Sequence, residues 1–366
     1  MKVLFDNQIF ILQKYGGISR YFFELMSYLN NNNFNFELPL AYSDNDYLKE
    51  KNFYSNSPLL SCEYLPFKKK IRRKVNDLKI KNVLRKQNFD LFHPTFYNPD
   101  FLKDLGNKPF IITVYDMINE LFAYQFADDK IPEYKKLLVE KASKIIAISK
   151  STKKDLIKLY GINEDKIEII YLASSFKDRD FKIGNDIHLP EKYILFVGNR
   201  GYYKNFEFFI KSISQLLVLD NKLKVICAGG PGFSEYEQAL LSSLNIKENI
   251  IHYSINNDMT LIQLYKNALA FVFPSLYEGF GIPVLEAFSC GCPVILSNTS
   301  SLPEIANDAA IYFDPKDEIS IKDNIEKVIY NEELRKNLIK EGFIQLSKFS
   351  WDKTAEQTKK LYESVI

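Results

Sequence analysis

Short apolar runs alternate with amphipathic segments along the whole chain. Apolar residues recur with helical spacing in segments such as 20–31, 155–161, 205–220 and 259–268. The strand-like runs lie at 2–5, 36–42, 91–96, 110–116, 144–149 and 167–171, and again at 193–198, 223–230, 249–255, 268–274, 293–298 and 310–313. Continuous apolar runs separated by helices are typical of parallel sheets covered on both faces. The pattern predicts an α/β fold with doubly wound sheets.

The pattern restarts once, at the strand-like run that opens at residue 193. A polar stretch without clear periodicity precedes it. A chain of 366 residues also exceeds what one hydrophobic core usually holds. We therefore expect two Rossmann-like domains facing a central cleft, where ligands of such sheets bind. The predicted parts are an N-terminal domain at 1–172, a linker at 173–192, a second domain at 193–349 and a C-terminal helix at 350–366 that packs back on the first domain.

Charge and composition exclude several classes of protein. The formal net charge is only +2, which argues against a nucleic-acid partner. The four cysteines lack the spacing of metal ligands and only three histidines are present, so no zinc site is expected. The N-terminus lacks the apolar core of a signal peptide, and no apolar run is long enough for a membrane span. We expect a cytoplasmic protein, at most peripheral on the inner face of the cytoplasmic membrane.

The stretch "FPSLYEGFGIPVLEAFSCG" contains two glutamates, Glu278 and Glu286, with seven residues between them. A strand before the stretch and Pro283 at the start of an apolar run predict a strand, a loop and a helix. Helix N-termini attract phosphate and other anions. The carboxylates could then bind the hydroxyl groups at either side of a diphosphate, as a nucleotide sugar requires. Equally, Glu278 could be a solvated loop residue and Glu286 an acid matched to the helix dipole.

Other candidate residues follow predicted strands and so belong to the carboxyl edges of the sheets. Arg200 and Lys204 follow the first strand of the second domain, where two cations could hold a diphosphate. The alternative is a basic loop in solvent. In the first domain the candidates are Gly16 and Gly17, which would let the backbone approach a ligand, and His93 and Asp116, which follow the third and fourth strands. A glycine turn and a structural histidine are the competing interpretations.

With these residues in place, the sequence resembles the retaining family-4 glycosyltransferases of the GT-B fold. The E-x7-E block at 278–286, "VGNRGYYKN", "KIIAISKSTKKDL" and "FSWDKTAEQTKKLY" carry the resemblance over nearly the whole chain. The family implies that Glu286 binds the ribose and Glu278 lies beside the donor sugar. It also implies that the amides of Phe280, Gly281 and Ile282 lie near that sugar. Arg200 and Lys204 would hold the diphosphate, and Gly16 and Gly17 would approach it. Asn199 is a further predicted substrate-binding residue.

Two positions depart from the family pattern. Tyr115 stands where members often have a histidine before Asp116, which puts a histidine contact to the sugar in doubt. Arg200 and Lys204 are spaced more tightly than in many members, so Arg200 is the weaker match. A D-x-D sequence can bind a bridging metal ion, but "DNDY", which begins at Asp44, lies in a polar loop of the first domain and is interpreted as surface. No metal or other cofactor is therefore expected.

The resemblance implies a retaining, metal-independent transfer from a GDP-mannose or UDP-sugar donor to a glycan or lipid-linked oligosaccharide acceptor, as in O-antigen or capsule synthesis. Retention usually suggests a carboxylate nucleophile. We instead expect Glu278 to position and stabilise the sugar, with the leaving phosphate taking the acceptor proton, and we count Asp116 and His93 with it as catalytic candidates. A nucleotide-sugar epimerase and a catalytically idle sugar-nucleotide sensor are the alternatives.

The stretch 66–87 is strongly basic, with Asp77 as its one acid. Ile71, Val75 and Leu78 fall on one helical face, which predicts a basic amphipathic helix of the kind that lies on anionic membranes. A solvated helix and a nucleic-acid contact are the alternatives. The predicted membrane-surface residues are Lys68, Lys69, Lys70, Arg72, Arg73 and Lys74.

Overall fold

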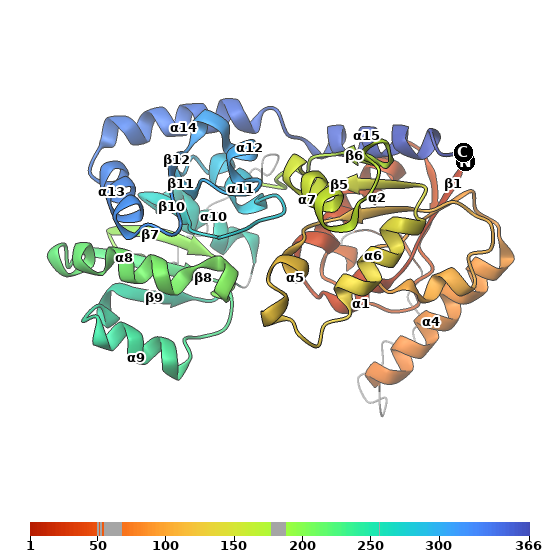
Figure 1. The fold of residues 1–366 in the computed structure, drawn as a ribbon, viewed down its shortest axis with the longest axis horizontal. Coiled ribbons are helices and arrows are strands. Elements are labelled where there is room, and N and C mark those ends of the chain that lie inside the picture. Colours follow the sequence, from red (N-terminus) through yellow and green to blue (C-terminus); the bar gives the residue numbers. More distant parts are fainter. Residues whose placement is uncertain (50, 52, 55–67, 177–187, 256) are drawn as a thin grey trace. The chain divides into compact units, whose positions relative to one another are not determined.

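The computed structural model describes residues 1–49, 51, 53–54, 68–176, 188–255 and 257–366 (Figure 1). The chain forms two compact units. Unit 1 comprises Met1–Leu172 together with Trp351–Ile366, and unit 2 comprises Ala173–Ser350. Residues 177–187 of the predicted linker lie outside the described residues, so its boundaries stay a prediction.

Unit 1 is built on parallel strands, and its central strands β1, β3, β4 and β5 are mostly apolar and buried. Its two strand groups run in the orders β2-β1-β3 and β4-β5-β6, and a parallel bridge between Phe92 and Phe110 joins β3 to the start of β4. All pairings are parallel, as the continuous apolar runs predict. The strands are β1 (Lys2–Phe5), β2 (Asn35–Glu37), β3 (Leu91–His93), β4 (Ile111–Val114), β5 (Lys144–Ala147) and β6 (Ile167–Ile169).

Helix α7 of unit 1 begins and ends at residues that suit helix ends. In α7, the Ser149 hydroxyl accepts a hydrogen bond from the Thr152 amide at 3.0 Å, and Gly161 ends the helix with a left-handed φ of 65°. The last helix, α15, packs against α2, so it belongs to unit 1 although 178 residues of unit 2 precede it. The helices are α1 (Gln8–Leu12), α2 (Gly17–Asn31), α4 (Lys68–Lys86), α5 (Ile118–Leu121), α6 (Ile131–Lys141), α7 (Lys150–Tyr160) and α15 (Trp351–Glu363).

Unit 2 contains a parallel sheet in the order β12-β11-β10-β7-β8-β9. From β7 the chain runs outward through β8 to β9, then returns to β10 on the other side of β7 and continues to β12. The order therefore reverses between β7 and β10, the place where doubly wound sheets bind ligands. The strands are β7 (Lys192–Val197), β8 (Leu223–Ala228), β9 (Ile250–Tyr253), β10 (Ala270–Phe273), β11 (Val294–Ser297) and β12 (Ile311–Phe313).

Helices flank the sheet of unit 2 and complete its core (Figure 1). Helix α8 packs against α13, and α11 packs against α14. The fully buried rings of Phe196 and Phe209 stack at 6.3 Å between β7 and α8. The helices are α8 (Phe206–Leu219), α9 (Glu235–Ser243), α10 (Asp258–Asn267), α11 (Ile282–Ser289), α12 (Leu302–Ala306), α13 (Glu318–Ile329) and α14 (Glu332–Leu346).

Two details differ from the sequence-based expectations. Strand β2 ends at Glu37, short of the predicted 36–42, because Pro39 cannot donate a ladder hydrogen bond. In α4 the predicted apolar face is wrong, since Leu78 is 60% exposed. The buried face instead contains Arg72, Asn76, Ile80 and Leu84, which are spaced four residues apart. Asn76 Oδ1 accepts hydrogen bonds from the backbone amides of Ala41 and Tyr42, and these tertiary contacts select that face.

Candidate active site

The switch point between β7 and β10 brings together two side chains that are 74 residues apart. Lys204 follows β7 and Glu278 follows β10, and Lys204 Nζ donates to Glu278 Oε1 at 2.6 Å. Both side chains are mostly buried, with 14% and 10% of their surfaces exposed. A paired lysine and glutamate with little solvent around them can interact strongly with a charged ligand, because screening by water is weak there.

The turn that carries Lys204 is tied to the loop that carries Glu278. The Leu276 amide donates to the Tyr203 carbonyl at 2.7 Å, which joins the two segments through their backbones. The Lys204 ammonium also lies 4.9 Å from the centre of the Phe273 ring and 5.2 Å from that of Tyr203. Such cation–π contacts add a modest attraction and limit the positions available to the ammonium group.

Two serines of the β11–α12 turn, which were not predicted as site residues, support the same loop. Ser300 Oγ accepts from the Glu278 amide at 2.9 Å. Ser301 Oγ donates to the carbonyls of Glu278 and Phe280 at 2.9 and 3.0 Å. A run rich in hydroxyl residues at the end of a buried strand, "SNTSS", was the signal that could have identified them.

Helix α11 starts at the predicted place, directly after the glutamate loop. Gly281 is its N-cap with a φ of 99°, a left-handed conformation that favours glycine, and none of the described side chains caps the helix. A Cβ atom on Gly281 would lie 3.0 Å from Leu302 Cδ2. Phe280 is buried and packs edge-on against Phe349, while Ile282 is half-buried at the first helical position. The helix therefore presents backbone groups, not a capping side chain, at its N-terminus.

Glu286 lies on the second turn of α11 and is 9% exposed. The Tyr265 hydroxyl, from α10, donates to its Oε2 at 3.4 Å. Burial, followed by the charge of Glu286, raises the pKa of Tyr265 well above its usual value, so this hydroxyl keeps its proton as a donor. Tyr265 was not predicted as a site residue, because its position in an apolar helical pattern is typical of the core.

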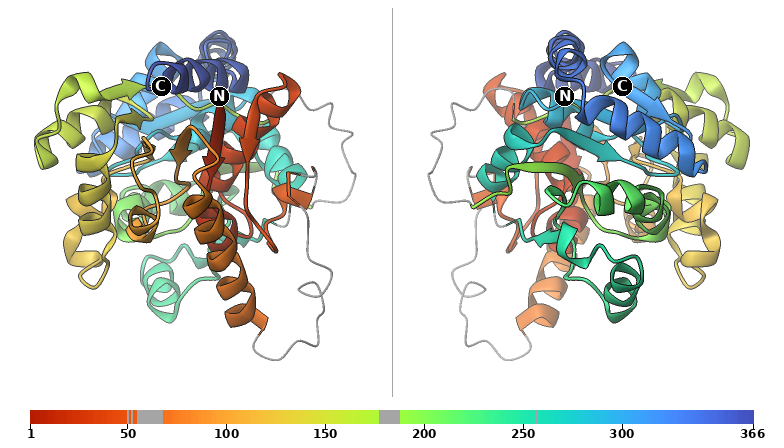
Figure 2. Two further views of the ribbon diagram at one scale, coloured as in Figure 1. Left: turned by 90° about the vertical axis from the view of Figure 1, so that its right-hand side faces the viewer. Right: turned by 90° about the vertical axis from the view of Figure 1, so that its left-hand side faces the viewer.

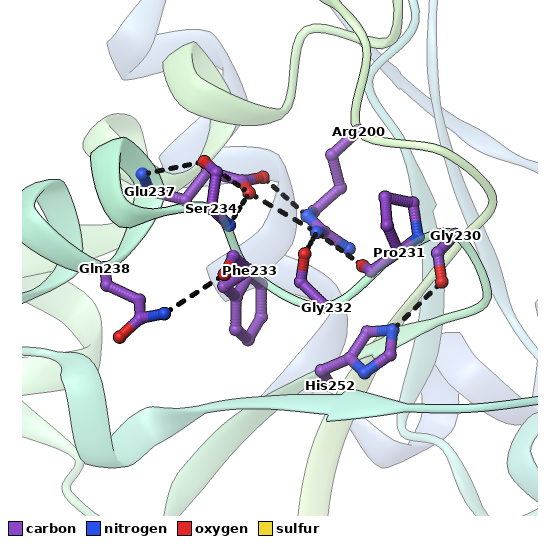
Figure 3. Close-up of polar contacts among 9 residues, drawn as sticks. All are labelled: Arg200, Gly230, Pro231, Gly232, Phe233, Ser234, Glu237, Gln238 and His252. Atoms are coloured by element: carbon purple, nitrogen blue, oxygen red, sulfur yellow. Dashed lines mark hydrogen bonds and ion pairs between the residues drawn. The ribbon is translucent and has the colours of Figure 1, made fainter.

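Arg200 and Asn199 lie on the same turn as Lys204 but differ from it in their surroundings. Asn199 is exposed. The Arg200 side chain is 3% exposed, and its Nε donates to Glu237 Oε1 at 2.6 Å (Figure 3). Its Nη2 donates to the carbonyls of Pro231 and Gly232. These contacts place the guanidinium against the β8–α9 connection, which the prediction of a diphosphate contact did not include.

In unit 1, Gly16 and Gly17 lie at the N-terminus of α2, the first long helix after β1. Gly16 is the N-cap, with an extended φ of 169°, and Gly17 is exposed. A Cβ atom on Gly16 would lie 2.5 Å from Gln13 Oε1, which accepts a hydrogen bond from the Ser19 amide. The close backbone approach at this glycine is therefore to Gln13, and Gly17 provides the exposed part of the turn.

His93 lies in the core of unit 1 and not at an accessible edge. It is fully buried, with Nδ1 2.6 Å from the Tyr362 hydroxyl and Nε2 3.0 Å from Thr113 Oγ1. Burial lowers the pKa of His93 to about 3, so the ring is neutral near pH 7. Because both ring nitrogens are occupied within the unit, this placement does not support the predicted catalytic role.

Asp116 follows β4 and is half-buried. Its Oδ1 accepts from the Ile118 amide at 3.0 Å, and its carbonyl accepts from Lys135 Nζ at 2.9 Å. Lys135 in turn forms a buried ion pair with Glu120 at 2.9 Å. This network holds the segment that follows β4 in a defined shape, and Asp116 Oδ2 makes no hydrogen bond with the described residues.

The basic helix α4 presents most of its predicted membrane-facing cations to solvent. Lys69, Lys70, Arg73 and Lys74 are exposed, and Lys68 begins the helix. The prediction that Arg72 faces a membrane surface is wrong. Its side chain is 10% exposed and lies over the Tyr42 ring at 3.5 Å, because it belongs to the buried face. Within the described residues, no helix is both long and apolar enough to cross a membrane.

The fold and the site together define a two-unit α/β protein of the doubly wound type, with a charged site at the switch point of its second sheet. A family model described as "Glycosyltransferase Family 4" matches residues 15–173, and one described as "Glycosyl transferases group 1" matches residues 177–345. The chain therefore belongs to glycosyltransferase family 4, as the sequence resemblance indicated, and it is a glycosyltransferase.

Individual relatives agree with this assignment. The chain is 27% identical over 300 residues to an uncharacterized glycosyltransferase of Methanocaldococcus jannaschii, which covers 77% of each protein. It is 29% identical over 287 residues to O-antigen chain mannosyltransferase B of Escherichia coli, covering 75% of this chain and 74% of that protein. The structure of Anabaena HepE in complex with UDP-glucose matches 100% of both chains with a TM-score of 0.74 and 16% identity. The predicted GT-B fold is confirmed.

Proposed function

We propose that this protein transfers a sugar, with retention, from a nucleoside-diphosphate sugar to a hydroxyl group of a growing surface glycan. The observation that carries the proposal is the Lys204–Glu278 pair at the switch point, directly before the uncapped N-terminus of α11. A cation and helix amides suit a diphosphate, and a carboxylate suits sugar hydroxyls. The mannosyltransferase relative favours a GDP-mannose donor, and a UDP-sugar is the second choice.

Each residue of the site has a proposed task. Lys204 stabilises the negative charge that develops on the departing diphosphate, together with the amides near Phe280, Gly281 and Ile282. Glu286, held by Tyr265, accepts hydrogen bonds from the ribose. Glu278 positions the sugar and stabilises positive charge at its reacting carbon, while the leaving phosphate takes the acceptor proton. No metal ion is assigned to these steps, since Lys204 and the helix end supply the charge.

Unit 1 has its own proposed tasks. We propose that the turn at Gly16 and Gly17 contacts a substrate through its backbone, and that Asp116 binds a substrate hydroxyl through Oδ2. We further propose that the exposed cations of α4 lie on an anionic membrane, which would suit a lipid-linked acceptor for O-antigen or capsule synthesis. Figure 2 shows α4, in orange, extending beyond the rest of unit 1, which would leave these cations accessible.

Binding of nucleoside diphosphates tests the proposal directly. Purified protein is titrated with UDP, GDP, ADP and dTDP by calorimetry and by thermal shift. We expect one of them to bind, and at 100 times its Kd to stabilise the fold by about 2.7 kcal/mol. The sugar donor of that base should then yield a glycosylated acceptor with an unchanged anomeric configuration by NMR. The absence of any binding would contradict the proposal, and conversion of the donor to its epimer without an acceptor would indicate an epimerase.

A further inference from the structure

Among the described residues, the hydrogen bonds of the Arg200 guanidinium go to the connection between β8 and α9 and to the first turn of α9. Its Nε and Nη2 contact both carboxylate oxygens of Glu237, at 2.6 and 3.4 Å (Figure 3). Its Nη2 also donates to the Pro231 carbonyl at 2.7 Å and to the Gly232 carbonyl at 3.0 Å. The remaining nitrogen, Nη1, is buried and has no hydrogen-bond partner among the described residues. The group is therefore enclosed by its own unit.

The partners of Arg200 are themselves held in place. Phe233 lies under the guanidinium at 4.5 Å, which removes water from that side. Glu237 also forms a capping box with Ser234 at the start of α9. Although burial opposes it, hydrogen bonds from Arg200 and Ser234 lower the pKa of Glu237, so the carboxylate stays charged. A bidentate, poorly hydrated pair of this kind is rigid.

The clamped connection contains a tight glycine turn that packs on the Lys204 turn. Gly229 and Gly230 both have left-handed φ values, 82° and 68°. A Cβ atom on Gly230 would lie 3.2 Å from the Gly198 carbonyl oxygen and 3.3 Å from Asn199 Cα. The turn after β8 thus rests directly against the start of the turn after β7, which ends at Lys204. A shift of one turn would move the other.

We propose that Arg200 is a positioning residue that fixes the turn at 229–232 against the turn at 198–204, and so sets the place of Lys204 in the donor site. The inference rests on the proposed function and deepens it. It replaces a direct contact between Arg200 and the diphosphate, because a guanidinium enclosed by Glu237, two carbonyls and Phe233 is unavailable to a ligand.

Two variants separate the two roles: R200Q and E237Q. The ligand is the nucleoside diphosphate among UDP, GDP, ADP and dTDP that the wild type binds most tightly. We expect R200Q and E237Q each to raise its Kd about tenfold, since small misplacements of a site are costly. In both variants the donor KM should rise more than kcat falls. A direct diphosphate contact predicts the opposite for E237Q, because the released arginine would bind as well or better.

Controls keep the outcomes distinct. K211Q breaks the exposed ion pair of α8 in which Lys211 Nζ lies 2.6 Å from Glu207 Oε1, and it should leave the Kd unchanged. Circular dichroism checks that each variant is folded. If R200Q does not fold, E237Q decides the question, because glutamine is nearly isosteric with glutamate. Unchanged Kd values in R200Q and E237Q would overturn the positioning role alone. A wild type that binds none of the four nucleotides would overturn the proposed function and this inference with it.

Discussion

At the scale of single residues, the site depends on a charge pair that bulk water scarcely reaches. Lys204 and Glu278 each keep a small exposed surface, which is where a ligand would make contact. Because the two residues are far apart in the sequence, the pair can be identified only once the strand order is known. A charge at such a place interacts strongly with a nearby charged ligand, because little water screens it.

Replacing Lys204 with glutamine should reduce kcat/KM for the donor roughly 100-fold, the usual cost of losing a group that stabilises a developing charge. The variant also leaves Glu278 without its cation. Steady-state kinetics with the donor identified by binding provides the measurement, and K211Q serves as the matched lysine control. If kcat/KM of the K204Q enzyme is within twofold of the wild-type value, Lys204 does not stabilise the departing diphosphate.

His93 should make unit 1 less stable in mild acid. Its pKa is about 3 when folded, below the 6.5 of an exposed histidine. The unfolded chain therefore binds a proton that the folded chain does not, so stability is complete above pH 6.5 and is lost as the pH falls. Between pH 7 and pH 5 the loss is about 2 kcal/mol.

Denaturant unfolding followed by the fluorescence of Trp351, the only tryptophan, measures this effect. Trp351 lies beside Tyr21 in unit 1, so it reports on the right unit. H93Q, which does not titrate, is the control and should lose about 2 kcal/mol less over the same pH range. Equal pH dependence of the two proteins would mean that other groups dominate.

At the scale of secondary structure elements, the turn at Gly281 sets where the N-terminus of α11 lies. Its left-handed φ and the nearby Leu302 methyl leave little room for a side chain. We expect G281A to lower the free energy of unfolding by about 1 to 2 kcal/mol and to weaken nucleotide binding, since the helix end must shift. Urea unfolding and calorimetry measure the two effects.

Gly201 supplies the control for that substitution. It has a φ of −58°, and no atom lies within 4 Å of the place that a Cβ atom would take, so G201A should change stability by less than about 0.5 kcal/mol. If G281A binds nucleotide as tightly as the wild type does, the N-terminus of α11 is not part of the donor site.

Helix α4 carries the proposed membrane contact, and reversing its charges tests it. The triple variant K69E/K70E/K74E should abolish sedimentation with vesicles containing anionic lipid, since each cation contributes about 1 kcal/mol. Donor affinity should persist. The control K327E/K336E/K340E changes three exposed lysines of α13 and α14 and should still sediment. Unchanged sedimentation of the α4 variant would refute the contact.

The strands were predictable from the sequence because parallel strands buried on both faces leave continuous apolar runs. The exposed face of α4 was not, because Asn76 is buried by hydrogen bonds to Ala41 and Tyr42, which a helical pattern cannot show. The glutamates and Lys204 were identified from their places after strands. The role of Arg200 depends on Glu237, a contact that follows only from how two neighbouring turns pack.

At the scale of the whole molecule, helix α15 belongs to a unit that the chain left at Leu172. Tyr362 is fully buried there and bonded to His93. Y362A should lower the stability of unit 1 by about 3 to 5 kcal/mol, the usual cost of removing a buried aromatic ring. The Trp351 transition would shift to lower denaturant while nucleotide binding by unit 2 persists.

The same helix provides the control, K360A, which removes only an exposed pair with Glu356. Its Trp351 transition should match that of the wild type. If Y362A left the transition unchanged, α15 would contribute little to unit 1 and the contact with His93 would be dispensable.

The return of α15 to unit 1 also has a consequence for biosynthesis. Domains usually fold in the order in which the ribosome makes them. Here residues 351–366 are translated after every residue of unit 2, so unit 1 waits for its last helix while unit 2 is already complete. During that interval the nascent N-terminal half keeps an apolar surface uncovered, and a chaperone that recognises such surfaces would find its substrate there.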